Sequence, residues 1–170
     1  MIEIHPAKPS DAAVLSELSR RTFIETFAQF NSPDNMNIYL NDAFSEEKQL
    51  AEIEDRKRQI YIAWNTKEAI GFFHLFHGSA DAAVKGDNPI ELLRLYVVSA
   101  WHGKGVAQAL MNHCLELCRQ GGYKTLWLGV WESNFRAQTF YRKYSFIWVG
   151  QHIFKLGHDE QIDLIFAKDL

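Results

Sequence analysis

The spacing of apolar and polar positions divides the first half of the chain into a strand, helices and a hairpin. After a Pro-Ser-Asp start signal, apolar residues recur at helical spacing, at Val14, Leu15, Leu18, Phe23 and Phe27. "PSDAAVLSELSRRTFIETF" therefore predicts a helix, and "MIEIH" before it predicts a strand. "NSPDNMNIYLNDAFSEEKQLAEIEDRK" predicts one or two polar helices, broken near Phe44 and Ser45. "QIYIAW" and "AIGFFHLFH", joined by "NTKE", predict a β-hairpin.

The second half alternates strands and helices. The segment from Gly78 to Pro89 predicts a loop, followed by a strand from Glu91 to Val98 and a helix from Val106 to Arg119 that stops at Gly121-Gly122. "TLWLGVW" predicts a strand, Asn134 to Tyr144 a helix, and "FIWVGQHIF" and "QIDLIFAKDL" two closing strands. Because strands and helices interleave, we expect one α/β (α+β) domain over residues 1–170, with helices packed on a sheet.

Composition narrows the class of protein. Of 170 residues, 47% are hydrophobic and 23% are charged, which is typical of a soluble globular domain. A net charge of −3 gives no electrostatic reason to bind nucleic acid or an anionic membrane, and the apolar runs are too short to span a bilayer. The chain shows no signal-peptide pattern, and its two cysteines, Cys114 and Cys118, lie one helical turn apart. We therefore expect buried core thiols and a cytoplasmic location.

Two groups of metal-binding residue types do not predict a metal site. His74 and His77 lie three positions apart on a strand, so their side chains are expected on opposite sides of the sheet. His113 lies beside Cys114 and Cys118 on a leucine-rich helix, where core packing is the better interpretation. We expect no metal.

A glycine-rich turn, "HGKGVA", joins the strand that ends at Val98 to the next helix. Backbone N–H groups at a helix start attract anions, and glycines let a ligand approach closely. The turn is not a P-loop, because Val98 stands where a P-loop needs its first glycine and Gly105 stands where it needs serine or threonine. Gln108 stands where a dinucleotide-binding fingerprint needs its third glycine. A phosphate cradle of another kind and an ordinary tight turn both remain open.

The turn and its flanks together resemble the GNAT superfamily of N-acetyltransferases. "ELLRLYVV" is similar to the fourth strand of that family, and "LGVWESNFRAQTFYRKYSF" to its fifth strand and following helix. The resemblance spans roughly residues 2–169 and is most specific from Glu91 to Phe146. "ETF…NSPDNMNIYLNDAF" and "EQIDLIFAKDL" further resemble bacterial PaiA-type spermidine/spermine N-acetyltransferases. The fold implied is a mixed, mostly antiparallel twisted sheet flanked by helices, with the fourth and fifth strands splayed.

The resemblance implies acetyl-CoA as co-substrate and a set of binding residues. Main-chain groups of Leu95, Tyr96 and Val97 would pair with pantetheine, and Asn134 would bind the pantetheine arm or simply cap the next helix. His102 stands in place of the family's usual Arg or Gln. Backbone amides would cradle the pyrophosphate, with charge added by Lys104, along the segment Gly103, Lys104, Gly105, Val106, Ala107 and Gln108.

The resemblance also implies catalytic roles. Tyr141 matches the tyrosine that gives a proton to the departing CoA thiolate, although the helical spacing also fits a core stripe with Phe140 and Tyr144. A free alkylamine is mostly ammonium at pH 7, so a proton acceptor is needed. Glu91 matches the glutamate base of some family members, Glu132 is a second candidate, and both also fit solvated carboxylates at strand ends.

The leading hypothesis is direct acetyl transfer to a primary amine in a ternary complex, because no cysteine lies at the expected acyl site. Two alternatives are a non-catalytic acyl-CoA-binding regulatory domain and an acetyltransferase of protein or peptide amines. A homodimer is compatible with all three hypotheses. From Pro33 to Arg58 the chain carries seven acidic and four basic residues. This excess of negative charge would attract a polyamine, but it also fits an ordinary solvated helix face.

Overall fold

The computed structural model describes residues 1–170 and contains five α-helices and seven strands. The elements follow in the order β1 (Ile2–Pro6), α1 (Ala12–Phe27), α2 (Pro33–Ala43), α3 (Glu46–Glu54), β2 (Arg58–Asn65), β3 (Glu68–Phe76), β4 (Pro89–Val97), α4 (Val106–Gln120), β5 (Thr125–Trp131), α5 (Phe135–Lys143), β6 (Ile147–Leu156) and β7 (Asp159–Asp169). Every strand and helix predicted from the spacing of apolar residues is present. None of the helices combines the length and apolar character needed to cross a membrane.

The polar segment after α1 forms two helices because serines start each of them. The Ser32 hydroxyl accepts a hydrogen bond from the Asn35 N–H, and the Ser45 hydroxyl accepts one from the Lys48 N–H. Each bond satisfies a donor that the first turn of a helix leaves unpaired. Phe44, between the two helices, is fully buried. The chain therefore breaks where the sequence predicted.

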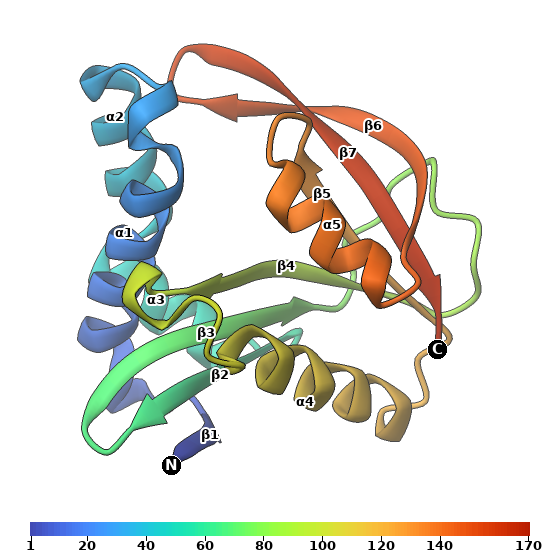
Figure 1. Cartoon of the computed structure of the whole chain (residues 1–170), viewed down its shortest axis with the longest axis horizontal. Helices are drawn as coiled ribbons and strands as arrows, with labels where there is room; N and C mark the ends of the chain where they lie inside the picture. Colours follow the sequence, from blue (N-terminus) through green and yellow to red (C-terminus); the bar gives the residue numbers. More distant parts are fainter.

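All seven strands form one sheet, in the order β1-β2-β3-β4-β5-β7-β6. Every neighbouring pair is antiparallel except β4 and β5, which are parallel. These two strands pair only from Pro89–Thr125 to Glu91–Trp127, and beyond Glu91 they separate. Figure 1 shows β4 with the strands below it and β5 with the β6–β7 hairpin above it. The fold is the mixed sheet with a splayed central pair that was expected.

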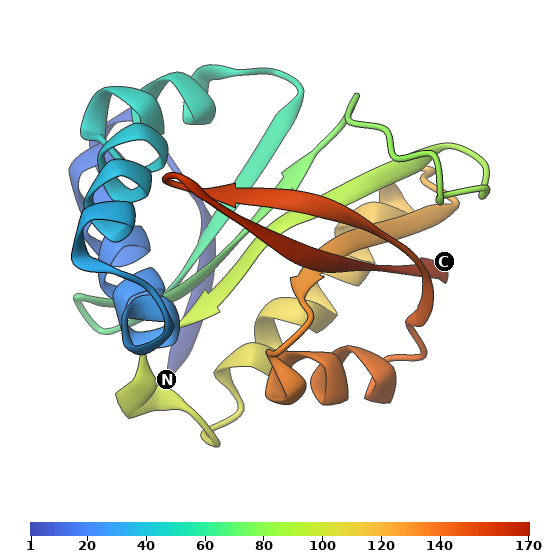
Figure 2. The same cartoon turned by 90° about the horizontal axis from the view of Figure 1, so that it is seen from above.

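Helices cover both faces of the sheet. The α4 face carries α4 and α5, whose Leu110 and Tyr141 belong to the main core cluster. The α1 face carries α1, whose Leu15 and Leu18 pack with Phe72 of β3. Figure 2 shows α1 and α2 side by side at one end, far from α4 and α5, with the turn of the β6–β7 hairpin reaching α2. The helices on the two faces therefore flank the splayed strands from opposite sides of the sheet.

Residues that were expected to pack do so. Cys114 and Cys118 are buried free thiols on α4. His113 contacts Tyr61, with 5.0 Å between the ring centroids. His74 is fully buried, whereas His77 is exposed beyond the end of β3.

Candidate active site

A cavity of about 780 Å³ lies where β4 and β5 separate. Successive side chains of a strand point to opposite faces of the sheet, so each residue that lines the cavity can be placed on one face or the other. Leu92, Val130 and Phe166 lie in the core cluster with α4, so their neighbours in sequence point to the α1 face. Those neighbours include Glu91, which lines the cavity. The cavity therefore joins the two faces of the sheet.

The glycine-rich turn forms the entrance of the cavity on the α4 face. Gly105 is the N-cap of α4 with φ +82°, and Gly103 has φ +75°, which is the left-handed region that favours glycine. A Cβ built on either residue would meet no atom within 4 Å, so space is open beside both. No side chain caps α4, so N–H groups of its first turn, from Val106 to Gln108, remain available to an anion.

His102 is held beside this turn by two neighbours. Its Nε2 lies 2.7 Å from the carbonyl oxygen of Val97, and Arg136 Nη1 lies 2.9 Å from its Nδ1. Arg136 Nη2 also lies 3.2 Å from Nε2, so the guanidinium contacts both ring nitrogens. The fixed positive charge here comes from Arg136, a residue that sequence reasoning did not single out. Lys104 is exposed and lies over Trp101, with Nζ 5.0 Å from the ring centroid.

The edge of β4 that faces the cavity is only partly paired. Leu95, Tyr96 and Val97 pair with β3 on their other edge and all line the cavity. Asn134 lines it too, and its Oδ1 accepts the N–H of Ala137 at 3.1 Å, so it is the N-cap of α5. The Asn134 amide NH₂ makes no hydrogen bond to the protein, which leaves it free for a ligand.

Tyr141 reaches the cavity from the α4 face. Its ring packs in the core, 5.5 Å from Phe140 and 5.7 Å from Phe146 between ring centroids, and only 8% of the residue is exposed. Burial raises the pKa of the Tyr141 phenol, so the hydroxyl stays protonated at neutral pH. The hydroxyl makes no hydrogen bond to another residue. It is a proton donor without a protein partner at the edge of the cavity.

The sequence of this site matches a known family. The model of the Acetyltransferase (GNAT) family matches residues 20–146. The chain belongs to the GNAT family of acetyltransferases. Acetyl-CoA is therefore its co-substrate, and the open glycine turn with unpaired amides fits the phosphates of CoA.

Relatives and solved structures agree with this assignment along the whole chain. An uncharacterised N-acetyltransferase from Lactobacillus delbrueckii subsp. lactis is 30% identical, covering 99% of this chain and 98% of the relative. One from Mycobacterium tuberculosis is 29% identical, covering 95% and 99%. The PaiA N-acetyltransferase of Thermoplasma acidophilum in complex with coenzyme A has a TM-score of 0.80 at 24% identity, covering 100% and 99%. YncA of Salmonella typhimurium, solved with acetyl-CoA, has a TM-score of 0.76 at 18% identity, covering 100% and 94%.

Two carboxyl groups of this acetyltransferase, one buried and one partly buried, face the cavity from the α1 face. Glu91, the last residue of β4 that pairs with β5, is 9% exposed, and burial raises the pKa of its carboxyl. Asp163 of β7 pairs with Trp131 of β5, so the two share a face, and burial raises the pKa of Asp163 to about 6. Sequence reasoning missed Asp163, although an acidic residue within the apolar run "IDLIF" was a detectable signal.

Aromatic rings surround the same end of the cavity. The Trp131 ring lies 6.0 Å from that of Phe27 and 5.1 Å from that of Phe30, and Tyr39 lies 5.4 Å from Phe154, all between centroids. These five rings come from four separate parts of the chain and all line the cavity. Together with the two carboxyl groups they form a wall suited to an alkylammonium ion.

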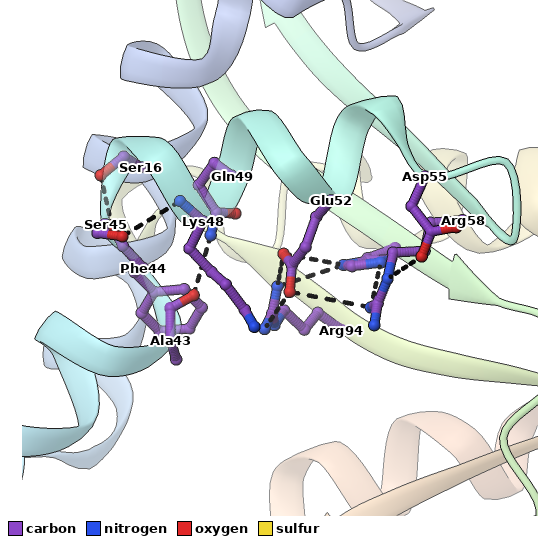
Figure 3. A network of polar contacts seen from close by, with 11 residues as sticks. Ser16, Ala43, Phe44, Ser45, Lys48, Gln49, Glu52, Asp55, Arg58 and Arg94 are labelled. Atoms are coloured by element: carbon purple, nitrogen blue, oxygen red, sulfur yellow. Dashed lines mark hydrogen bonds and ion pairs between the residues drawn. The ribbon is translucent and has the colours of Figure 1, made fainter.

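The negative charge of the cavity does not come from residues 33–58, as the sequence had suggested. None of the seven acidic residues between Pro33 and Arg58 lines the cavity. Figure 3 shows two of them in a polar network on α3 and its neighbours, where Glu52 faces Arg94 and Asp55 faces Arg58. Arg94 Nη1 lies 2.7 Å from Glu52 Oε2, so the one guanidinium that β4 brings to the cavity is neutralised. The carboxylates that line the cavity are Glu25, Glu91 and Asp163.

Two other acidic residues contribute less to the cavity. Glu25 binds Arg21 at 3.2 Å and accepts the Ser99 N–H at 2.8 Å, so its charge is already compensated. Glu132, the second base considered from sequence, is exposed and does not line the cavity. Glu91 and Asp163 are therefore the carboxyl groups without a cationic Lys or Arg partner there.

Asp163→Asn is expected to stabilise the folded protein at pH 8. The unfolded chain ionises this carboxyl near pH 3.8 and the folded protein near pH 6, so ionisation disfavours folding. The penalty is complete above pH 6 and disappears as the pH falls from 6 towards 3.8. Neutral asparagine removes it, so we expect the free energy of unfolding to rise by about 3 kcal/mol at pH 8 and by much less at pH 4. Urea denaturation at both pH values measures this difference, and a variant less stable than wild type at pH 8 would contradict it.

Proposed function

We propose that this acetyltransferase transfers the acetyl group of acetyl-CoA directly to a primary amine that carries further positive charge, with a polyamine such as spermidine or spermine as the acceptor. The observation that carries the proposal is the α1 face of the cavity, where two carboxyl groups without cationic Lys or Arg partners meet a wall of aromatic rings. Carboxylates and aromatic faces both attract alkylammonium ions. The resemblance to PaiA-type enzymes and the structural likeness to a PaiA N-acetyltransferase support the same acceptor class.

The two faces of the cavity then have separate tasks. On the α4 face, the amides from Gly103 to Gln108 hold the pyrophosphate of CoA, with Arg136 adding positive charge beside His102. The free edge of β4 and the Asn134 amide hold the pantetheine arm. The thioester is thereby placed between the splayed strands, where an amine from the α1 face can reach it.

The reaction needs a proton acceptor near the amine and a proton donor near the sulfur. We assign the first role to Glu91, which lies at the closed end of the splay and whose raised pKa makes it a stronger base than an ordinary glutamate. We assign the second to Tyr141, whose hydroxyl remains protonated and unpaired. Attack of the amine on the thioester carbon breaks the C–S bond, and Tyr141 protonates the departing thiolate.

The charge of the acceptor is expected to decide its rate of reaction. We expect kcat/KM for spermidine to exceed that for a monoamine of similar length at low salt, because Glu91 and Asp163 attract the additional ammonium groups. Salt screens charges over about 10 Å at 0.1 M, so the preference should shrink as salt rises. Steady-state rates for both amines across a salt series test this. Equal kcat/KM values at low salt would rule out selection by charge.

A further inference from the structure

A second group of ionisable side chains lies on the α1 face beside Asp163. His152 of β6 stands opposite Asp163 in the β6–β7 ladder, with 3.9 Å between its Nε2 and the Asp163 Oδ2. On its other side, His152 Nδ1 lies 3.0 Å from Oδ2 of Asp81, in the loop between β3 and β4. His152 and Asp163 line the cavity, and Asp81 does not. The group therefore runs from the cavity outward.

Asp81 fixes the orientation of the imidazole ring. The Ala83 N–H donates to Oδ1 of Asp81 at 2.9 Å, and this bond lowers the pKa of Asp81, so its carboxylate stays ionised. An ionised carboxylate only accepts hydrogen bonds, so a neutral His152 must carry its proton on Nδ1. Its Nε2 lone pair is then directed towards Asp163.

The space in front of these two atoms is open because β5 has a glycine there. Gly129 lines the cavity on the exposed surface of β5. A Cβ at this position would lie 3.2 Å from Asp163 Oδ2 and 3.3 Å from His152 Nε2. Without that atom, an N–H group of a ligand has room to reach both the carboxylate and the imidazole.

His152 is the most exposed member of the group. Its side chain is 37% exposed, whereas that of Asp163 is 15% exposed and that of Asp81 is 16% exposed. Glu91 is 9% exposed and lies deeper in the cavity wall. An imidazole nitrogen can either accept or donate a hydrogen bond, so the more exposed ring of His152 can bridge the cavity and water.

We propose that His152, with Asp163 as its partner in the cavity and Asp81 as a positioning residue, takes the proton that the acceptor amine releases to solvent. This inference rests on the proposed function. In one turnover, R–NH₃⁺ and acetyl-CoA give R–NH–CO–CH₃, HS-CoA and one proton. The nitrogen gives up two protons as the C–N bond forms and the C–S bond breaks. Glu91 accepts one of them, which is matched by the proton that Tyr141 gives to the thiolate, and the other must leave the cavity.

The titration of Asp163 supports this role. Its pKa near 6 lets the Asp163 carboxyl take up or release a proton close to neutral pH. The other titratable and charged groups around the pair are Tyr39 of α2, Glu91, Arg94 and Tyr96 of β4, and Asp81. Arg94 is paired with Glu52, and burial raises the pKa of both tyrosines. We therefore expect kcat to fall as the pH drops through about 6, where Asp163 becomes protonated.

Four variants test the proposal with the acceptor that the wild type acetylates fastest. We expect H152Q to lower kcat about tenfold and D81N about fivefold, with the Kd of acetyl-CoA unchanged because these residues lie on the α1 face. D87N, an exposed residue of the same loop, is the matched control and should behave as wild type. Added imidazole should restore activity to H152A, which a purely structural role of His152 would not allow.

The outcomes separate this inference from the function on which it rests. Wild-type kcat and an unchanged pH profile in both H152Q and D81N would overturn the proton route while leaving the acetyltransferase assignment intact. A wild-type enzyme that acetylates no amine would contradict the proposed function and the proton route together. Circular dichroism melts of each variant establish that lost activity does not come from lost structure.

Discussion

Replacing Tyr141 by phenylalanine is expected to lower kcat about 100-fold while leaving the Kd of acetyl-CoA unchanged. The ring is buried among Phe140, Phe146 and the rest of the main core cluster, and phenylalanine keeps those contacts. Only the hydroxyl is lost. Because it makes no hydrogen bond within the protein, its removal leaves no buried group without a partner.

The measurement is kcat under conditions where chemistry limits the rate, together with the Kd of acetyl-CoA from calorimetry. Tyr144→Phe is the matched control, because Tyr144 is the C-cap of the same helix and its hydroxyl donates to the carbonyl oxygen of Gln108 at 3.5 Å, outside this cavity. It should keep wild-type kcat. An unchanged kcat in Tyr141→Phe would remove this residue from the chemistry and leave it as a core residue.

The second large effect concerns the glycine turn. Gly105→Glu is expected to weaken acetyl-CoA binding at least tenfold, about 1.4 kcal/mol. Nothing lies within 4 Å of a Cβ at this position, so the glutamate would occupy the space that the phosphates need and would repel them. Its positive φ adds strain of about 1 kcal/mol for any residue other than glycine.

Gly105→Ala separates strain from obstruction, because alanine has the same backbone strain with neither the bulk nor the charge. We expect its Kd for acetyl-CoA to remain much closer to that of wild type. Calorimetry on folded protein compares the two variants. If Gly105→Glu bound acetyl-CoA as tightly as wild type, the turn before α4 would not be the phosphate site.

The sequence predicted features that depend on local chemistry. The start of α4 follows from Gly105 and the apolar period after it, and the break at Phe44 follows from the Ser45 cap. The separation of β4 and β5 was expected only through the family resemblance. Periodicity alone gives no information about where two strands separate.

What the sequence could not predict depends on contacts between distant segments. Asp81 and His152 are 71 positions apart, and His102 and Arg136 are 34 apart. The His152–Asp163 pairing depends on the register of β6 and β7, which shifts between Trp148 and Gly150. The charge of residues 33–58 was also misleading, because burial of Glu52 beside Arg94 cannot be inferred from a count of charges.

We expect an amine that enters from the α1 face to receive the acetyl group bound on the α4 face. The most direct test is release of CoA from acetyl-CoA across a panel of polyamines, amino acids, aminoglycosides and peptides, with the intact mass of each product. We expect CoA release to match the appearance of a singly acetylated primary amine, fastest with polyamines. Tight binding of acetyl-CoA with no acetylated product from any amine would contradict the account.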